Sequence, residues 1–384
     1  MERIYDYTIK LLRYVLKGDV PDLPNDVDFE KLYEFGRSHG VENMLYVGLK
    51  DLKIDVPKDV FQKFYYSYLM SIKIDTLQTM ELEKIGKAFE EAGIDYIPLK
   101  GSVVKYFYTM PNYRKSGDID VLIKREDEEN ARKVLTEQLG CSPFKASDRY
   151  EVHSAYVSKT HVHIELHRQI LRTANRAYKT FKNVWKCAIL SDGSGHKHRL
   201  PHELLYIHQL AHFCHHIYRG GAGIRMLMDF YVMKKSIDFD EDALKYWLKK
   251  SNLVEIDNYV NNTVDKWFGN SYSIDEDVET LVKIILSGGS FGTREMGEKI
   301  HDSTGLNGRF RQLFKRVFLP ADSLVIVRPD YVDGKNSKFL MHSRRLKSIL
   351  LHGRGKVFVE AKGILKNNGS DNNLKKIADA VCER

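Results

Sequence analysis

The chain has 384 residues, which exceeds one typical domain and predicts more than one packed unit. Of these residues, 43% are hydrophobic and 29% charged, a composition that excludes a disordered or fibrous protein. No apolar run approaches the ~20 residues that a membrane-spanning helix requires. Residues 1–7 carry charges where a secretory signal has an apolar core, so we expect a cytoplasmic protein.

Charge is unevenly distributed along the chain. The net charge is +8, whereas residues 305–384 contain 17 Lys and Arg against 7 Asp and Glu, a surplus of +10 that leaves −2 for residues 1–304. A basic C-terminal region suits an anionic partner such as a nucleotide or nucleic acid, although a solvated basic surface would have the same composition. The four cysteines include no CxxC pair, which predicts reduced thiols and no zinc–thiolate site.

Residues 1–92 have the hydrophobic periodicity of helices. The longest predicted helix begins at Pro57 and ends near Gly93. The residues that we expect on its buried face are Phe61, Tyr65, Leu69, Ile72, Leu82, Ile85 and Phe89. This region is therefore expected to be an all-helical N-terminal unit.

Residues 93–170 have mixed strand and helix patterns. The predicted elements are a strand at 95–100, a helix at 103–108, a strand at 118–123, a helix at 126–139 and a hairpin of 150–157 with 161–167. In the region 171–304 helices are predicted at 202–218, 224–235, 241–250 and 254–268. The basic region 305–384 ends in a segment that we expect to be a loosely tethered helix. The sequence thus predicts an α+β fold, with a small mixed β-sheet embedded between helical N- and C-terminal regions.

Asp118 and Asp120 lie one residue apart in an otherwise apolar predicted strand. Alternate side chains of a strand point to the same face, so the two carboxylates project together while Ile119, Val121 and Ile123 face the other way. Adjacent carboxylates repel each other unless a cation or a proton intervenes. The pair therefore predicts a divalent-metal site.

Glu165 is the best candidate for a third carboxylate. In the segment 161–167 the even positions are apolar and the odd positions polar, which puts Glu165 on a polar strip with His161, His163 and His167. These histidines could also ligate a transition metal together with Glu165, although a wet face of the sheet explains them as well.

Three motifs together resemble the DNA polymerase β-type nucleotidyltransferase superfamily, and within it the bacterial uncharacterised nucleotidyltransferases with an LKG…DIDLL…ELH signature. The motifs are Leu99-Lys100-Gly101-Ser102, Asp118-Ile119-Asp120-Val121 and Glu165-Leu166-His167. The resemblance covers residues 94–167 well. It implies a polymerase β-like core in which Asp118, Asp120 and Glu165 are catalytic and bind Mg²⁺ or Mn²⁺, with a nucleoside triphosphate as substrate.

The resemblance also implies roles for residues beside the metal site. Gly101 and Ser102, at the start of a helix, would offer backbone N–H groups and a hydroxyl to the nucleotide phosphates. Lys100 and Arg114, on either side of this loop, could pair with the triphosphate. The spacer between Ser102 and Asp118 is slightly longer than is common in the superfamily, and the extra length falls in the loop that contains Arg114.

The predicted activity is metal-dependent transfer of a nucleoside monophosphate from the triphosphate to an acceptor, with release of pyrophosphate. The acceptor could be a small molecule, a protein or RNA, and residues 171–304 are expected to recognise it. Two alternatives stay open. One is a catalytically inactive nucleotide- or RNA-binding module with the same fold, and the other is a metal-dependent phosphohydrolase that uses the histidines of the predicted helix 202–218.

That predicted helix contains His208, His212, His215 and His216. The i,i+4 spacing of His208 with His212, and of His212 with His216, puts imidazoles on a common face. The helix lacks the Glu that would follow the first His in a zinc protease, so packing or hydrogen bonding in a substrate cleft is favoured over metal binding. Arg225 and Asp229 have i,i+4 spacing and are expected to pair, and a substrate-side role for Arg225 stays open.

Overall fold

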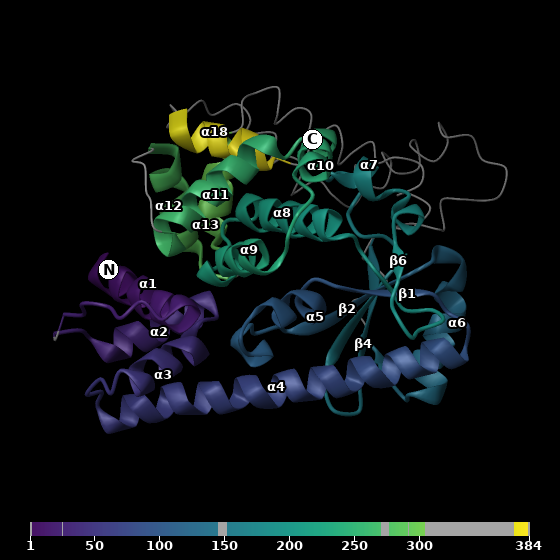
Figure 1. The fold of residues 1–384 in the computed structure, drawn as a ribbon, viewed down its shortest axis with the longest axis horizontal. Coiled ribbons are helices and arrows are strands. Elements are labelled where there is room, and N and C mark those ends of the chain that lie inside the picture. The colour runs from purple at the N-terminus through teal and green to yellow at the C-terminus, as the bar shows by residue number, and fades with distance from the viewer. Residues whose placement is uncertain are drawn as a thin grey trace, which may run out of the picture.

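The computed structural model describes residues 2–24, 26–144, 152–269, 276–290, 292–303 and 372–382. Most of the basic region 305–384, and with it the expected anionic partner surface, lies outside these residues. The observed fold is the predicted one, a small mixed sheet with helical regions before and after it (Figure 1). Within the described residues, no helix is both long and apolar enough to cross a membrane.

The N-terminal region consists of α1 (Glu2–Lys17), α2 (Phe29–His39), α3 (Glu42–Asp51) and α4 (Lys58–Glu91). The carboxylate of Asp28 caps α2 by accepting a hydrogen bond from the Lys31 N–H, and Gly40 ends the helix in the left-handed conformation at φ 68°. The long helix α4 has the predicted limits. It runs along the base of the molecule, beneath both the N-terminal helices and the sheet (Figure 1).

The prediction for the buried face of α4 is wrong in its first half. Tyr65, Leu69 and Ile72 are 44%, 42% and 37% exposed. The residues buried along the helix include Phe64, Ser71, Gln78 and Ile85, which follow one another every seven positions. Helix α4 has apolar residues on more than one side, and periodicity alone does not say which side meets the rest of the protein.

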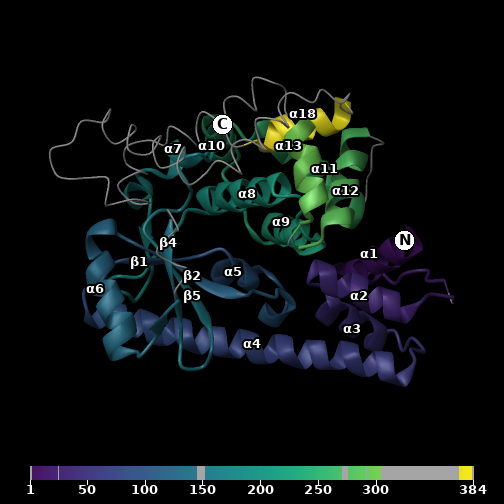
Figure 2. The same ribbon diagram turned by 180° about the vertical axis from the view of Figure 1, so that it is seen from behind.

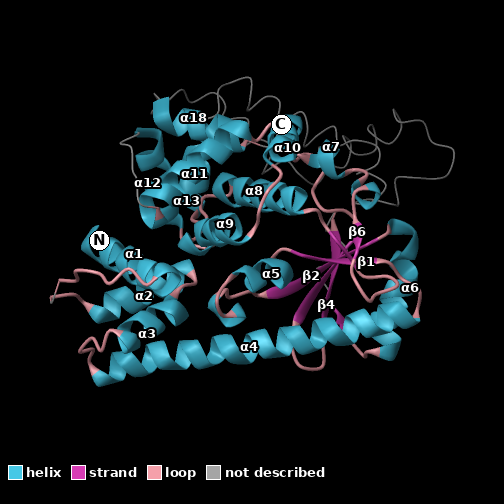
Figure 3. Cartoon of the chain, in the orientation of Figure 1, coloured by secondary structure: helices cyan, strands magenta, loops and turns pink. Residues whose placement is uncertain are grey.

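Five strands form the sheet in the order β1-β2-β5-β4-β3. Their bounds are Tyr96–Leu99, Asp118–Ile123, His163–His167, His153–Val157 and Ser142–Pro143 in that order. Strands β2 and β5 are parallel and the other pairs are antiparallel, so the predicted hairpin of β4 with β5 is confirmed. Figure 3 shows the strands gathered at one end of the molecule, over α4.

The two faces of the sheet lie in different surroundings because side chains alternate along each strand. Ile119, Val121 and Ile123 of β2 pack in a core with Phe89 of α4 and with Leu135, which follows α6 (Glu128–Lys133). The predicted helix 126–139 is observed as a 3₁₀ turn at Arg125–Asp127, then α6, and then a π-helical turn at Val134–Gln138. The opposite face of the sheet carries the polar residues and faces the second helical region.

The helices after the sheet match the prediction closely. Short strands β6 (Ile189–Leu190) and β7 (His198–Arg199) pair as a separate ribbon, and the helix α7 (Tyr178–Phe181) precedes them. The longer helices are α8 (His202–Tyr218), α9 (Ile224–Ser236), α10 (Glu241–Ser251), α11 (Val254–Phe268), α12 (Glu276–Gly288) and α13 (Arg294–Ser303).

The C-terminal helix α18 (Asn372–Val381) is firmly packed, contrary to the expectation of a loosely tethered segment. Its side chains Ile377, Ala378, Ala380 and Val381 are buried in the main core. The Arg176 guanidinium donates hydrogen bonds of 2.7 Å to the carbonyl oxygens of Asp379 and Cys382. These contacts hold the helix on top of α12 and α13 (Figure 2).

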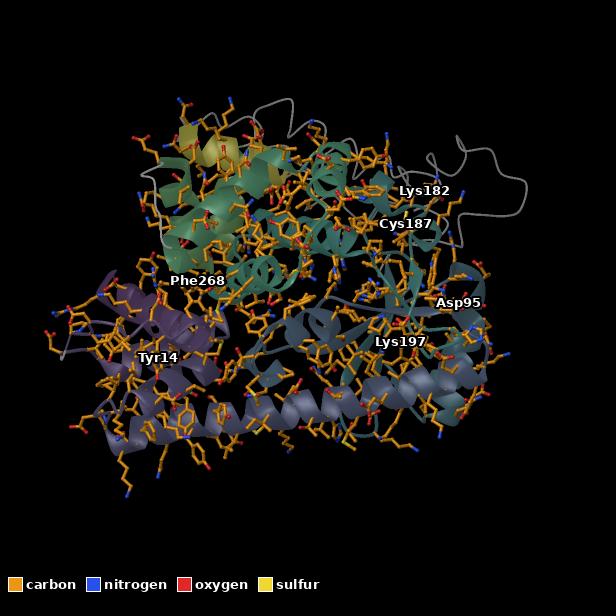
Figure 4. All side chains as sticks on the ribbon, in the orientation of Figure 1. Tyr14, Asp95, Lys182, Cys187, Lys197 and Phe268 are labelled. Carbon is orange, nitrogen blue, oxygen red and sulfur yellow. The ribbon has the colours of Figure 1, made fainter. Side chains whose placement is uncertain are left out.

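The N-terminal helices contact the second helical region directly. The Trp267 indole N–H of α11 donates a 2.6 Å hydrogen bond to the Tyr5 hydroxyl of α1. Phe268, labelled in Figure 4, is fully buried at this junction and its ring contacts that of Tyr231. The short helix α5 (Gly101–Val104) lies between α4 on one side and α9 on the other, as Figures 1 and 2 both show.

His39 connects α2 to the second helical region. Because this histidine is buried, we expect the protein to lose stability in acid. The buried Nδ1 of His39 accepts a hydrogen bond from the Ile224 N–H, which requires a neutral ring. Burial, only partly offset by a hydrogen bond to the Leu286 backbone, lowers the pKa of His39 from 6.5 to about 4. The unfolded chain therefore binds more protons between pH 4 and 6.5. The stability due to this group is complete above pH 6.5 and falls by up to about 3 kcal/mol towards pH 4.

The measurement is the free energy of unfolding by urea as a function of pH. His39→Asn keeps an acceptor atom and removes the titration, so its unfolding free energy should fall less steeply than that of the wild type between pH 6.5 and 4. His202→Asn, which removes an exposed imidazole, is the control. Identical pH slopes for the wild type and His39→Asn would show that this histidine is not buried in its neutral form.

Candidate active site

The sheet register brings the three predicted metal ligands together. Parallel strands β2 and β5 place Asp120 directly opposite Glu165, and Asp118 lies one step along the same face of β2. One carboxylate oxygen from each of the three lies within 4.8 Å of the others. Asp120 is almost fully buried, whereas Asp118 and Glu165 are partly exposed and so can be reached from solvent.

Lys100 is the nearest cation to this cluster. Its Nζ donates a 2.6 Å hydrogen bond to Asp120 Oδ1 and lies 3.7 Å from Glu165 Oε2. Burial opposes its charge, but the carboxylates of Asp120, Glu165 and Asp118 outweigh burial and raise the pKa of Lys100 to about 12. A permanent positive charge therefore lies between two of the three carboxylates.

The pKa values of Asp118 and Asp120 are shifted in opposite directions. Burial, followed by the charge of Asp120, raises the pKa of Asp118 to about 6. Burial also opposes ionisation of Asp120, but Lys100 and His167 outweigh it and hold the pKa of Asp120 well below its usual value. The Asp120 carboxylate is thus ionised at neutral pH and compensated by Lys100, while Asp118 is the less stable anion.

Lys100 also has an unusual backbone. It lies at the junction of β1 and α5 with φ 46° and ψ −121°, a conformation that non-glycine residues rarely adopt. Such strain costs of order 1–3 kcal/mol and persists only where surrounding contacts enforce it. The ion pair with Asp120 is one such contact, and the strained turn directs the lysine side chain towards the carboxylates.

Gly101 is required by close packing. A Cβ atom placed on it would lie 2.5 Å from Ser116 Oγ and 2.6 Å from Arg114 Nη1, closer than real side chains allow. The absence of a side chain therefore lets the loop before β2 approach the first turn of α5. The expected role of the Gly101 N–H towards phosphates is compatible with this packing and stays a prediction.

Ser102 lines a cavity of about 530 Å³ between α4, β1, α5 and the start of α8. None of the three carboxylates lines this cavity. Side chains of Lys87, Lys197 and Arg199 contribute cationic groups to it, and Figure 4 shows Lys197 beside the sheet. A contact of the Ser102 hydroxyl with phosphates stays a prediction.

The Arg114 side chain is held in a buried ion pair. A contact with a nucleotide would favour an arginine that is free beside Gly101 and Ser102. Instead, Nε and Nη2 of Arg114 each donate a 2.9 Å hydrogen bond to the Asp229 carboxylate of α9. The Tyr108 hydroxyl donates a third hydrogen bond, of 2.8 Å, to the same carboxylate. The expected pairing of Arg225 with Asp229 is wrong, because Asp229 pairs with Arg114 and Tyr108 and makes no ion pair with Arg225.

The histidine neighbours of Glu165 differ from the predicted set. His167 Nε2 lies 2.9 Å from Asp120 Oδ1 and 3.2 Å from Glu165 Oε2. The second histidine is His153 of β4, opposite His167 in the register, with its Nε2 3.3 Å from Glu165 Oε1. His161 is in the turn before β5 and His163 is exposed, and neither belongs to a possible metal-binding group among the described residues.

His153 was not a sequence-based candidate. It is the first residue of β4, a different strand from that of Glu165 and His167, and only the pairing of β4 with β5 brings it next to His167. Burial, together with the charge of His167, lowers the pKa of His153 to about 4. Burial also opposes protonation of His167, but hydrogen bonds to Asp120 and Glu165 outweigh it and raise the pKa of His167.

The histidines of α8 overlie the same face of the sheet. His208 is fully buried, and burial followed by the charge of Lys100 lowers its pKa to about 3. His212 Nε2 lies 3.1 Å from His216 Nε2. Neither of the possible metal-binding groups in the described part of the chain includes an α8 histidine, which favours the predicted packing or cleft role over a metal site.

The carboxylate cluster suits a divalent cation. Asp118, Asp120 and Glu165 offer hard oxygen donors, and all three are held by β2 and β5, which are directly hydrogen-bonded to each other. Lys100 already compensates part of the negative charge of Asp120, and the His167 ring lies 2.9 Å from the same carboxylate. On the side of Asp118 the repulsion between carboxylates persists, as the raised pKa of Asp118 indicates.

Comparison with known proteins identifies one related family. A family model described as "Uncharacterised nucleotidyltransferase" matches residues 25–269, which include the N-terminal helices from α2 on, the sheet and the helices to α11. Neither a search of curated proteins nor a search of solved structures returned a match.

Proposed function

Because the chain belongs to the family of uncharacterised nucleotidyltransferases, we propose that it uses a divalent metal, Mg²⁺ or Mn²⁺, to transfer a nucleoside monophosphate from a nucleoside triphosphate to an acceptor. Family membership indicates nucleotidyl transfer in general. The observation that supports the specific reaction is the convergence of Asp118, Asp120 and Glu165 on one partly exposed point of the sheet.

The reaction requires an oxygen nucleophile of the acceptor to form a bond to the α-phosphorus while the bond to the bridging oxygen breaks. Pyrophosphate leaves and the acceptor hydroxyl loses a proton. Metal ions held by Asp118, Asp120 and Glu165 would supply positive charge for the developing negative charge and activate the nucleophile.

Residues of the chain itself have defined parts in this proposal. Lys100 compensates Asp120 before the substrate arrives, and its side chain is long enough to turn towards a phosphate when another cation takes its place. Gly101 permits the close approach of the loop before β2. Arg114 acts as a positioning residue, since its ion pair with Asp229 holds that loop against α9.

Two further candidates have less support. An inactive binding module would not need three carboxylates that face one another, since their mutual repulsion is a cost in the absence of a cation. A phosphohydrolase built on α8 would need carboxylate ligands grouped with its histidines, and neither possible metal-binding group of the described residues includes an α8 histidine.

The test is incubation of the protein with each labelled nucleoside triphosphate and Mg²⁺ or Mn²⁺, with and without candidate acceptors. We expect metal-dependent release of pyrophosphate and label transfer to a hydroxyl-bearing acceptor, or slow self-labelling when no acceptor is present. Chelation by EDTA should abolish both. The proposal fails if the folded protein neither binds nor turns over any nucleoside triphosphate in the presence of metal.

A further inference from the structure

Among the described residues, the second helical region has an arginine without a hydrogen-bond or ion-pair partner on α9, the helix whose Asp229 binds Arg114 of the loop before β2. Arg225 is in the first turn of α9 and is only partly exposed. A Cβ atom placed on Gly40 would lie 3.6 Å from its Nε, so the side chain passes the turn between α2 and α3. Within the described part of the chain, its guanidinium makes no hydrogen bond and no ion pair.

The nearby carboxylate of Asp229 forms its ion pair with Arg114 and not with Arg225. Asp229 lies one helical turn further along α9, but both of its oxygens already accept hydrogen bonds from Arg114, and one accepts a third from Tyr108. Two guanidinium groups thus share the surroundings of a single structural carboxylate. Burial, followed by the charge of Arg114, lowers the pKa of Arg225, which indicates that its positive charge is poorly compensated.

A neutral histidine of α8, His216, belongs to the electrostatic surroundings of Arg225. The electrostatic neighbours of His216 include Arg225 and Lys100, and His216 is in contact with His212. Burial lowers the pKa of His216 to about 3, so both rings can donate hydrogen bonds without carrying charge at neutral pH. This stretch of α8 and α9, here called the α8–α9 wall, consists of His212, His216 and Arg225.

An unpartnered and partly buried arginine is costly to the fold, whereas an anionic ligand would compensate it. A guanidinium binds a phosphate or a carboxylate with two parallel hydrogen bonds. We propose that the α8–α9 wall binds an anionic group, a phosphate or a carboxylate, of the acceptor that receives the nucleotide. This inference rests on the proposed nucleotidyl transfer and specifies the chemical class of the acceptor.

The position of the wall favours the acceptor over the nucleotide as the source of the anion. Lys100 lies between Asp120 and Glu165 and leads into α5, the end expected to meet the triphosphate. Arg225 is on α9 and makes no ion pair with a carboxylate of the cluster in the described part of the chain, so it is a cationic group separate from Lys100. In phosphoryl transfer the attacking and leaving oxygens lie roughly in line on opposite sides of the phosphorus. Two separate cationic groups, one paired with the cluster and one without a carboxylate of its own among the described residues, suit two separate anions.

The experiment measures binding of inorganic phosphate to the full chain by calorimetry and by thermal shift, without metal and without turnover. Wild type and Arg225→Met are compared with Lys235→Met, a control that removes an exposed cation from the same helix. We expect phosphate to bind to the wild type and to the control. Binding to Arg225→Met should be at least 10-fold weaker, and Arg225→Lys should fall between them because it keeps the charge but loses the two-pronged geometry.

A second arm repeats the titration in the presence of a non-hydrolysable nucleoside triphosphate analogue and Mg²⁺ at saturation. Phosphate binding that persists supports an acceptor subsite. Its loss would show that Arg225 holds the phosphates of the nucleotide and would overturn the acceptor assignment. An analogue that does not bind would count against the proposed nucleotidyl transfer and not against the anion site.

The melting temperature without phosphate provides an independent check of folding. Arg225→Met removes an unpaired charge, so its melting temperature should equal or exceed that of the wild type. A large decrease would reveal a structural partner of Arg225 and would overturn the proposal, as would phosphate binding that is independent of Arg225.

Discussion

Replacing Asp118 with asparagine is expected to reduce kcat/KM for nucleotidyl transfer by about 10³-fold or more. Charge stabilisation by bound metal is worth several kcal/mol in the transition state, and each ~1.4 kcal/mol corresponds to a factor of ten in rate. The protein should stay folded, because the substitution removes a negative charge that is destabilised by burial and by Asp120. The measurement is steady-state kinetics of pyrophosphate release with whichever nucleoside triphosphate the enzyme prefers.

Asp118→Asn is a cleaner test than Asp120→Asn. Asp120 accepts a hydrogen bond from Lys100 and lies 2.9 Å from His167 Nε2, so its replacement would also remove the nearest counter-charge of the buried Lys100. Asp242→Asn, which changes an exposed carboxylate of α10, is the matched control and should keep wild-type kinetics. A loss of less than 10-fold in Asp118→Asn would exclude a direct role for this carboxylate in metal binding.

Replacing Asp229 with asparagine is expected to produce the largest loss of stability among single polar substitutions considered for this protein. Its carboxylate and the Arg114 guanidinium are both buried and joined by two 2.9 Å hydrogen bonds. Removing one partner of such a pair leaves an uncompensated buried charge, which costs about 3–5 kcal/mol. Arg225 nearby increases the excess of positive charge in the variant. Urea unfolding at pH 7 measures the effect.

The exposed pair of Arg294 with Glu298 on α13 is the control for this prediction. Glu298→Gln should leave the unfolding curve unchanged within error, because exposed ion pairs are screened by solvent. The paired substitution Arg114→Met with Asp229→Leu should recover much of the stability lost in Asp229→Asn, since it removes both charges. If Asp229→Asn unfolds like the wild type, the ion pair does not join the loop before β2 to α9 in solution.

Local sequence patterns correctly predicted those helices and strands in which the apolar residues keep one regular spacing over the whole segment. The helices at 202–218 and 254–268 were predicted with the observed limits, because apolar residues recur with helical spacing over each whole segment. Alternation in the segments 118–123 and 161–167 correctly separated buried apolar residues from the polar face. Alternation has a period of two in every strand, so it needs no knowledge of which strands pair.

Contacts were predicted less well where a side chain or a helix face has several possible partners. Arg225 and Asp229 have the spacing of a helical ion pair, but Arg114, distant in sequence, contacts the carboxylate instead. Tyr65, Leu69 and Ile72 are spaced like a core stripe and are exposed. In both cases several arrangements satisfy the local rule, and the choice among them depends on contacts between distant segments.

The sequence by itself determined that Asp118 and Asp120 share one face of a strand and that Glu165 lies on the polar face of another, because side-chain alternation is a property of a single strand. Only the tertiary structure decided that these strands are parallel neighbours in a register that brings the three carboxylates together. The same holds for Lys100 beside Asp120, for His153 opposite His167, and for Arg225 without a carboxylate of its own. Strand register and helix packing follow from the burial of the whole core, to which every segment contributes and which no single segment specifies.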